Sequence, residues 1–82
     1  MMMLYIKKQG ETLIGISLSK KHGNAVKRNR VKRLLRAVYM PLKDSIKEGY
    51  FIVFLPKPAD EYSFDRFSAE IDRLLKKEDL LC

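Results

Sequence analysis

The residues best able to do chemistry in this chain are basic and lie close together. Nine Lys and Arg residues fall between Thr12 and Lys43, and no Asp or Glu interrupts them. They are Lys20, Lys21, Lys27, Arg28, Arg30, Lys32, Arg33, Arg36 and Lys43. Like charges three or four residues apart repel one another on a helix, so a stretch that served only solubility would mix signs. The stretch therefore predicts a bound polyanion.

The order of residues within this stretch favours phosphate as the anion. Two lysines follow a predicted strand and lead into the positive end of a predicted helix. The arginines that continue the helix have planar forks that match phosphate oxygens. Asn29 is a poor helix former in mid-helix, so we assign it a hydrogen bond to a base, sugar or phosphate, the alternative being an exposed residue of modest cost. The predicted contacts are Lys20, Lys21, Lys27, Arg28, Asn29, Arg30, Lys32, Arg33 and Arg36.

Protein-based catalysis has few residues to use. His22 is the only histidine, and no carboxylate lies within ten residues of it. We expect an exposed side chain or a phosphate contact there rather than a general base. The lone cysteine, Cys82, excludes an internal disulfide and a cysteine zinc site, and the glycine patterns of nucleotide-binding loops are absent. We predict no catalytic residue and no protein-bound metal.

Length and composition favour a single domain over residues 1–82. Seventeen cations and ten anions give the chain a net charge of +7. The basic stretch has a net charge of +9, and the rest of the chain has a net charge of −2. No apolar run exceeds six residues, which is too short for a membrane span or a signal peptide. One cysteine suits a reducing compartment, so we expect the cytoplasm.

The first half of the chain predicts two strands and a helix. Residues 4–8 and 12–19 are predicted strands, joined as a hairpin by the glycine-containing turn 9–11. Asn24 is the predicted N-cap of a helix that begins at Ala25. Its apolar stripe lies opposite a polar side formed by Asn29, Arg30, Lys32, Arg33 and Arg36. Pro41 predicts that this helix stops near Met40, with a further turn or two over 42–47.

The second half predicts a strand and a final helix. Residues 50–55 form a continuous apolar run, which predicts a central strand covered on both faces. Ser63 is the predicted N-cap of a helix with an apolar stripe of Phe64, Phe67, Ile71, Leu74 and Leu75. The acids on and before this helix are interpreted as a solvated face. The predicted order is ββαβα, a small sheet packed by two helices, in the α+β class.

Three segments carry a specific resemblance to a known family. They are 15–21 (GISLSKK), 23–26 (GNAV) and 28–36 (RNRVKRLLR), followed by the apolar strand 50–55 and the closing helix through Leu75. Together they resemble the protein subunit of bacterial ribonuclease P over residues 14–75, about three quarters of the chain. The string in its strand, loop and helix context is far more specific than a lone basic helix.

The resemblance implies a ribonucleoprotein in which a catalytic RNA removes the 5′ leader from precursor tRNA. The RNA would hold the catalytic Mg²⁺ ions, and this chain would assist as a subunit of the endoribonuclease. The family fold implies an α/β sandwich of the ribosomal protein domain 2-like type with a left-handed βαβ crossover, against the usual hand. In that family the basic loop and helix pack on the catalytic RNA, which implies the same for the matching residues here.

The resemblance also implies one departure from the family pattern. Family members usually begin with a further helix and strand that help to bind the leader, and this chain starts at what resembles the strand after them. We therefore expect an exposed apolar surface that favours a homodimer. Candidate leader contacts are Tyr5, Ser17 and Ser19.

Two other functions compete with this interpretation. One is a general RNA- or DNA-binding module of the ribosomal-protein type without a role in tRNA processing. The other is a stand-alone nuclease, which would cleave precursor tRNA without a catalytic RNA. The number and type of basic residues alone do not separate the first of these from a ribonuclease P subunit.

Overall fold

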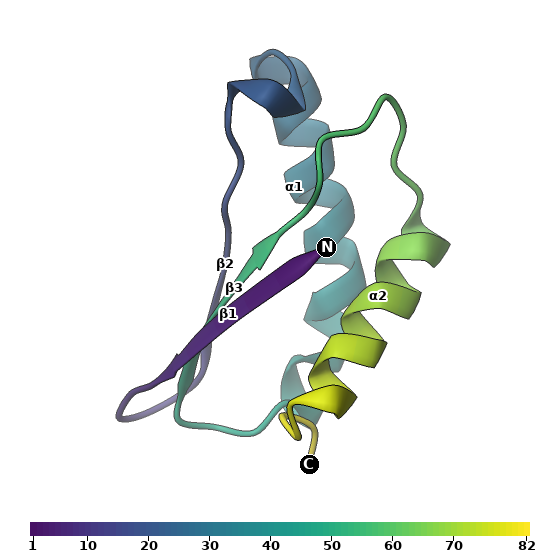
Figure 1. Ribbon diagram of the computed structural model, residues 1–82. Coiled ribbons are helices and arrows are strands. Elements are labelled where there is room, and N and C mark those ends of the chain that lie inside the picture. Colours follow the sequence, from purple (N-terminus) through teal and green to yellow (C-terminus); the bar gives the residue numbers. More distant parts are fainter.

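The computed structural model describes all 82 residues as one sheet with two helices on one of its faces (Figure 1). The strands are β1 (Met2–Lys7), β2 (Leu13–Ile16) and β3 (Tyr50–Leu55). The helices are α1 (Ala25–Tyr39) and α2 (Phe64–Lys77). Two short 3-10 helices, η1 (Lys20–His22) and η2 (Met40–Ser45), come before and after α1. The predicted ββαβα order is confirmed.

Both helices begin where a local capping residue predicts. The Asn24 side chain accepts a hydrogen bond from the amide of Lys27 at 2.9 Å, and Ser63 does the same for Arg66 at 3.2 Å. At the other end of α1, Pro41 follows the last helical turn and the chain continues as η2. Neither helix is both long and apolar enough to span a lipid bilayer.

The predicted hairpin between the first two strands is wrong. The strand order is β1-β3-β2, so β3 lies between the two strands that precede it in sequence. β1 pairs with β3 antiparallel, and β2 pairs with β3 parallel. β3 is the most apolar strand and buries Ile52 and Phe54 by taking the central place. The turn 8–12 therefore crosses the end of β3 instead of joining neighbouring strands, and the Lys8 amide bonds to the carbonyl of Gly49 at 2.9 Å.

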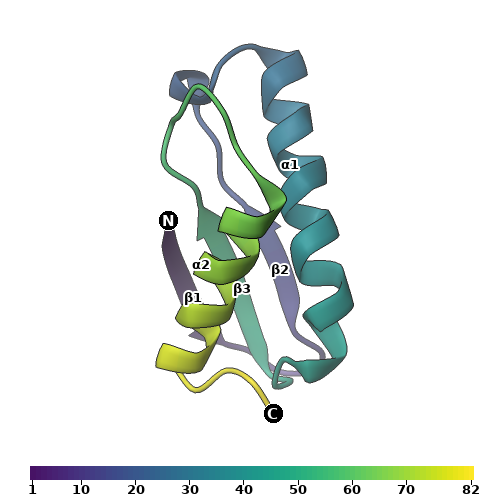
Figure 2. The ribbon, with the colours of Figure 1, turned by 90° about the vertical axis from the view of Figure 1, so that its right-hand side faces the viewer.

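The connection from β2 through α1 to β3 is left-handed. Seen with the helices in front, β2 and β3 both run upward and β3 lies to the left of β2 (Figure 2). A right-handed crossover would place the second strand on the right, as about 98% of such connections do. The hand that the family resemblance implies is thus confirmed.

One hydrophobic core fills the space between the sheet and the helices. α1 contributes Val31, Leu35 and Val38, while α2 contributes Phe67, Ile71 and Leu75. The inner face of β3 supplies Ile52 and Phe54, both fully buried. Phe64, predicted to lie in the stripe of α2, is 46% exposed because it begins the helix beyond the edge of this core.

The opposite face of the sheet is apolar and uncovered, so the prediction that β3 is covered on both faces is wrong. Both helices pack on the same face of the sheet (Figures 1 and 2). The side chains that alternate away from the helices are exposed or only partly buried. We call this surface the outer sheet face. It consists of Met2, Leu4, Ile6, Leu13, Phe51, Val53 and Leu55, which the strand register places side by side. Met2, Leu4 and Ile6 are 60%, 55% and 68% exposed.

Candidate nucleic-acid interface

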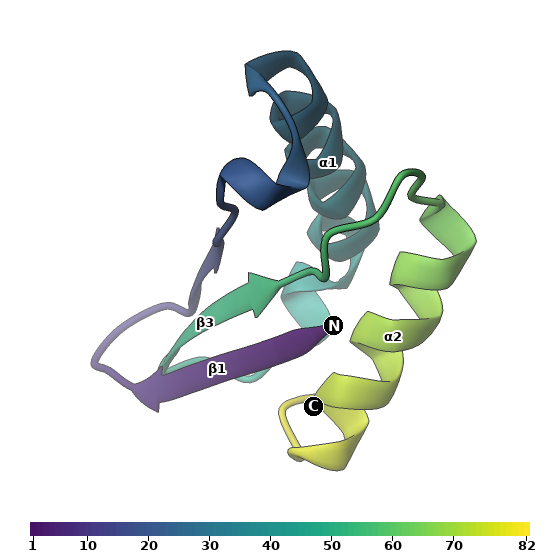
Figure 3. The same ribbon diagram turned by 45° about the horizontal axis from the view of Figure 1, so that its top comes forward.

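A short capped loop connects β2 to α1 and carries the first two cations of the basic stretch. The Ser19 hydroxyl accepts a hydrogen bond from the amide of Lys21 at 3.3 Å. In return the Ser19 amide donates to Nδ1 of His22 at 3.0 Å, which completes a reciprocal cap on η1. Lys20 and Lys21 belong to η1 and are exposed. The chain passes from this turn directly into α1 (Figure 3).

His22 is buried, contrary to the prediction of an exposed side chain or a phosphate contact. Its side chain is enclosed so that the residue is only 6% exposed. The ring bridges two segments, since Nε2 lies 2.6 Å from the carbonyl oxygen of Pro56 while Nδ1 accepts from Ser19. This pattern requires the neutral ring with its proton on Nε2. His22 therefore positions the lysine loop against the end of β3 and does not face an RNA ligand.

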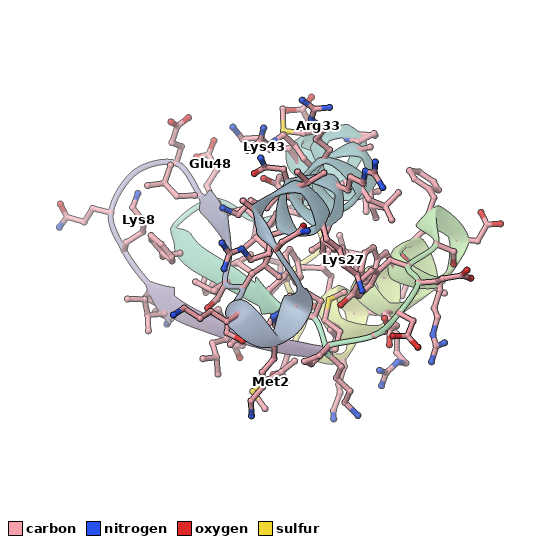
Figure 4. All side chains as sticks on the ribbon, turned by 90° about the horizontal axis from the view of Figure 1, so that it is seen from above. Met2, Lys8, Lys27, Arg33, Lys43 and Glu48 are labelled. Carbon is pink, nitrogen blue, oxygen red and sulfur yellow. The ribbon has the colours of Figure 1, made fainter.

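The cations of α1 cover its outer surface. Residues two apart lie about 200° apart around a helix, so Arg28 and Arg30 flank the helix on opposite sides. Arg33 points away from the sheet, on the opposite side of the molecule from Met2 (Figure 4). Lys27 and Arg28 are half-buried at the borders of the core, and the remaining predicted contacts on the helix are exposed. Asn29 is among the exposed ones.

None of the nine cations of the basic stretch forms a salt bridge. The three ion pairs of the molecule join the Met1 amino group to Glu70, Lys47 to Asp79, and Lys76 to Asp72. Among the nine cationic side chains, only Lys27 donates a hydrogen bond within the chain, from Nζ to the carbonyl of Ala59 at 2.9 Å. The positive charge of this surface is therefore left for an external anion to neutralise.

The structure separates the three candidate leader contacts. Ser17 is exposed and continues the alternation of Leu13 and Gly15 along the outer sheet face. Ser19 is used in the cap of η1. Tyr5 pairs in register with the buried Ile52, so it leans toward the helices. The three residues do not form one surface.

Tyr5 is held instead by the end of α2. Its hydroxyl donates to the carboxylate of Glu78 at 3.0 Å, and its ring meets Tyr50 edge to face. The hydrogen bond to Glu78, and then the negative charge of that carboxylate, raise the pKa of the Tyr5 hydroxyl above its ordinary value.

Sequence reasoning missed a groove between α1 and the segment that leads into α2. It has a volume of about 550 Å³ and is lined by Asn24, Val26, Lys27, Arg30, Val31, Leu34, Asp60 and Tyr62. No local signal joins Asp60 and Tyr62 to the basic helix, because the contact is made only by folding. The role of His22 had a local signal, since Ser19 and His22 have the spacing of a capping box. No three His, Cys, Asp or Glu side chains of the chain gather in a way that could hold a metal ion.

The comparisons with known proteins agree with this architecture. A family model described as Ribonuclease P matches residues 1–79. The chain belongs to the ribonuclease P protein family. It is 44% identical over 73 residues to the ribonuclease P protein component of Bacillus velezensis, covering 89% of this chain and 63% of that protein. It is 45% identical over 69 residues to that of Natranaerobius thermophilus, covering 83% and 60%.

Solved ribonuclease P proteins share the fold. The protein from Thermotoga maritima matches with a TM-score of 0.80 and 27% identity, over 92% of this chain and 74% of that one. The protein from Staphylococcus aureus matches with a TM-score of 0.80 and 26% identity, over 98% and 75%. The chain thus spans about three fifths of the length of the curated family members named above.

Proposed function

We propose that this chain is the protein component of a ribonuclease P, which binds the catalytic RNA of that enzyme and assists it in removing the 5′ leader from precursor tRNA. The unpaired charge of the loop and α1 carries the RNA-binding part of the proposal, and the family match carries its assignment to ribonuclease P. Nine cations without one acid or salt bridge follow each other along the loop helix η1, α1 and η2. The names of the curated relatives support the same function.

The geometry divides the RNA contacts into two kinds. Lys20 and Lys21 sit on a turn fixed by His22, so they meet RNA as point charges at a defined position. The arginines of α1 offer planar forks to phosphate oxygens along the helix. Asn29 lies among them and can donate to or accept from a base or a sugar. Phosphate contacts of this kind position the protein without reading sequence.

We assign the catalytic Mg²⁺ ions to the RNA, as the family resemblance implies. The contribution of this chain is then electrostatic. Folded RNA brings phosphates close together, and cations that lie against them lower the cost of that repulsion. The protein should therefore reduce the Mg²⁺ concentration that the RNA needs to fold and act.

We propose that the 5′ leader of precursor tRNA passes along β2 on the outer sheet face. Ser17 lies on that face and precedes the lysine loop, so a strand of RNA held there continues onto the basic surface. Phe51 lies farther along the same face, paired with Leu13 of β2. A Cβ at Gly15 would lie 3.9 Å from the Phe51 ring, so the missing side chain there leaves part of the ring uncovered. A partly exposed aromatic ring is a surface on which an unpaired base stacks.

We propose that a second copy of this chain covers the β1 side of the outer sheet face. Monomeric proteins seldom expose contiguous apolar surface of this kind, and β1 is also a free edge of the sheet. Ile6→Lys should shift a dimer to a monomer in light scattering after gel filtration. Met40→Lys is the matched control, because Met40 is 50% exposed but lies outside this face. A monomer at every concentration of the unaltered protein would contradict the proposal.

The test of the proposed function uses the catalytic RNA with precursor tRNA. We expect the protein to lower the Mg²⁺ concentration at which the RNA removes the leader to half its maximal rate. Arg30→Ala/Arg33→Ala should lose most of this effect, whereas Lys76→Ala/Lys77→Ala, which removes the same charge from α2, should keep it.

Two results would overturn the proposed function. An unrelated basic protein of equal charge that lowers the Mg²⁺ requirement as well would leave only a general nucleic-acid-binding module. Cleavage of precursor tRNA by the protein with Mg²⁺, after complete removal of RNA, would make it a nuclease in its own right.

A further inference from the structure

The groove between α1 and the segment before α2 has the size and composition of a ligand site. Its volume of about 550 Å³ falls within the range of 300–1,000 Å³ that is usual for small-molecule sites. One wall is apolar and is formed by Val26, Val31 and Leu34 of α1. Tyr62 faces them from the other side of the groove.

The walls of this groove are held in place by contacts within the chain. The Tyr62 hydroxyl donates to the carbonyl of Lys57 and accepts from the amide of Ala59, both at 3.0 Å. The Lys27 ammonium reaches across to the carbonyl of Ala59 (Figure 4). The Tyr62 ring packs on Phe67 with 5.4 Å between centroids. The segment 57–62 is thus tied to α1 and to the core before any ligand enters.

Three charged side chains line the groove, and Arg30 and Asp60 are left unpaired while Lys27 bonds to the carbonyl of Ala59. Arg30 and Asp60 are both exposed, and neither takes part in a salt bridge. Arg30 belongs at the same time to the cationic surface of α1. A ligand that matches this arrangement has a flat apolar body, a negative group next to Arg30, and N–H donors for the Asp60 carboxylate.

We propose that this groove holds one unpaired nucleotide of a bound RNA, and guanine in preference to the other bases. The base would lie between the aliphatic wall of α1 and the Tyr62 ring, and its phosphate would meet Arg30. Guanine presents two adjacent N–H donors on its Watson–Crick edge, which a single carboxylate accepts together. Uracil offers one donor flanked by carbonyl oxygens that the Asp60 carboxylate repels. This inference rests on the proposed function, because RNA binding is what brings a nucleotide to the groove.

The proposal is tested with mononucleotides on the protein alone. Guanosine 5′-monophosphate should shift the methyl resonances of Val26 and Leu34 and the ring resonances of Tyr62. It should bind about tenfold more tightly than uridine 5′-monophosphate, since one further hydrogen bond to a charged group is worth about that factor. Inorganic phosphate should leave the methyl resonances in place.

Asp60→Asn should remove the preference for guanine, because the amide can no longer accept two N–H groups. Asp65→Asn makes the same change of charge on an exposed residue in the first turn of α2 and should leave the preference intact. No methyl shift with guanosine 5′-monophosphate at up to roughly 10 mM would overturn the proposal. An unchanged preference in Asp60→Asn, or equal shifts from inorganic phosphate, would do the same.

Binding of the catalytic RNA, measured on the same samples, separates this inference from the proposed function. If RNA binds with the expected dependence on Arg30 and Arg33 but guanosine 5′-monophosphate leaves the groove unchanged, the groove proposal fails alone. If the nucleotide binds in the groove but the catalytic RNA is not bound, the proposed function fails and the groove stands as a nucleotide site.

Discussion

The two helices of this protein are nearly equal in length and pack on the same core, but they treat charge in opposite ways. α1 has 15 residues and α2 has 14, and each begins at a side-chain cap. On α2 the Lys76 ammonium lies 2.9 Å from Asp72 one turn away, and Glu70 meets the N-terminal amino group at 3.4 Å. α1 has six cations, no acid and no salt bridge. One helix balances its own charge, and the other exposes charge that repels itself.

The charges of α2 therefore stabilise the fold, whereas the cations of α1 are the ones that we propose bind RNA. Repulsion along α1 costs the free protein a few tenths of a kcal/mol for each like-charged pair. An RNA phosphate that contacts the helix removes this cost and adds charge-assisted hydrogen bonds. Substitutions on the inner faces of the two helices should therefore change the free energy of unfolding by similar amounts. Charge reversals on the two outer faces should change it in opposite directions.

The largest effects are expected where the two helices are alike. Leu35→Ala on α1 and Ile71→Ala on α2 each truncate a fully buried side chain. Each should lower the free energy of unfolding by about 2–5 kcal/mol, as lost burial and a cavity predict. Denaturant unfolding of the free protein measures both. A loss below 1 kcal/mol at either position would show that the two inner faces are not equivalent.

The next effect concerns the loop that leads into α1. His22→Ala removes the bonds to Ser19 and Pro56 and leaves buried partners unpaired, which should cost about 1–3 kcal/mol of unfolding free energy. It should also weaken RNA binding, because Lys20 and Lys21 lose their fixed position. Lys21→Ala is the control, since it removes one exposed charge and should change stability by no more than about 0.5 kcal/mol. Equal stability of the two variants would refute the positioning role of His22.

Smaller effects of opposite sign are expected on the two outer faces. Arg33→Glu places an acid three residues from both Arg30 and Arg36, so the free protein should gain about 0.2–0.5 kcal/mol for each new pair. Lys76→Glu on α2 breaks the pair with Asp72 and should lose stability of similar size. Thermal unfolding of the free protein measures both variants: the midpoint should rise in Arg33→Glu and fall in Lys76→Glu. Destabilisation by Arg33→Glu would mean that the cations of α1 serve the fold.

The smallest effect concerns Tyr5, whose hydroxyl donates a hydrogen bond to Glu78, the residue that follows α2. Glu78→Gln removes the negative charge that favours the neutral hydroxyl, so the pKa of Tyr5 should fall toward its ordinary value. In the unaltered protein the contribution of this contact to stability is complete below the pKa of an unfolded tyrosine, and it is lost as pH rises through the raised pKa of Tyr5. NMR titration of the Tyr5 ring measures the shift. An unchanged pKa in Glu78→Gln would assign the shift to burial.

Local features of this fold could be predicted from the sequence, because they depend on residues close to one another. Asn24 and Ser63 start the two helices, and Pro41 ends the first, as their chemistry predicts. The apolar stripes of both helices point inward for the same reason. The basic character of α1 was likewise visible, since helical periodicity alone places Arg33 and Arg36 opposite Val31 and Leu35.

The features that sequence reasoning missed depend on contacts between distant segments. A glycine turn predicts a hairpin, but the central place went to β3, whose Ile52 and Phe54 are fully buried there. His22 lies among cations in sequence and beside Pro56 in space. Asp60 and Tyr62 meet α1 only after the crossover has placed β3 and α2. The left-handed crossover itself opposes the general rule and came from the family resemblance alone.

The affinity of this protein for the catalytic RNA of ribonuclease P, measured against salt concentration, tests the central claim most directly. Arg30→Ala/Arg33→Ala should weaken binding and reduce the log–log slope by up to about two units, because each lost phosphate contact removes about one unit or less. Lys76→Ala/Lys77→Ala should leave both affinity and slope near those of the unaltered protein. If the two double variants lose the same affinity, or if the α1 variant keeps the full slope, the unpaired cations of α1 are not the surface that binds RNA.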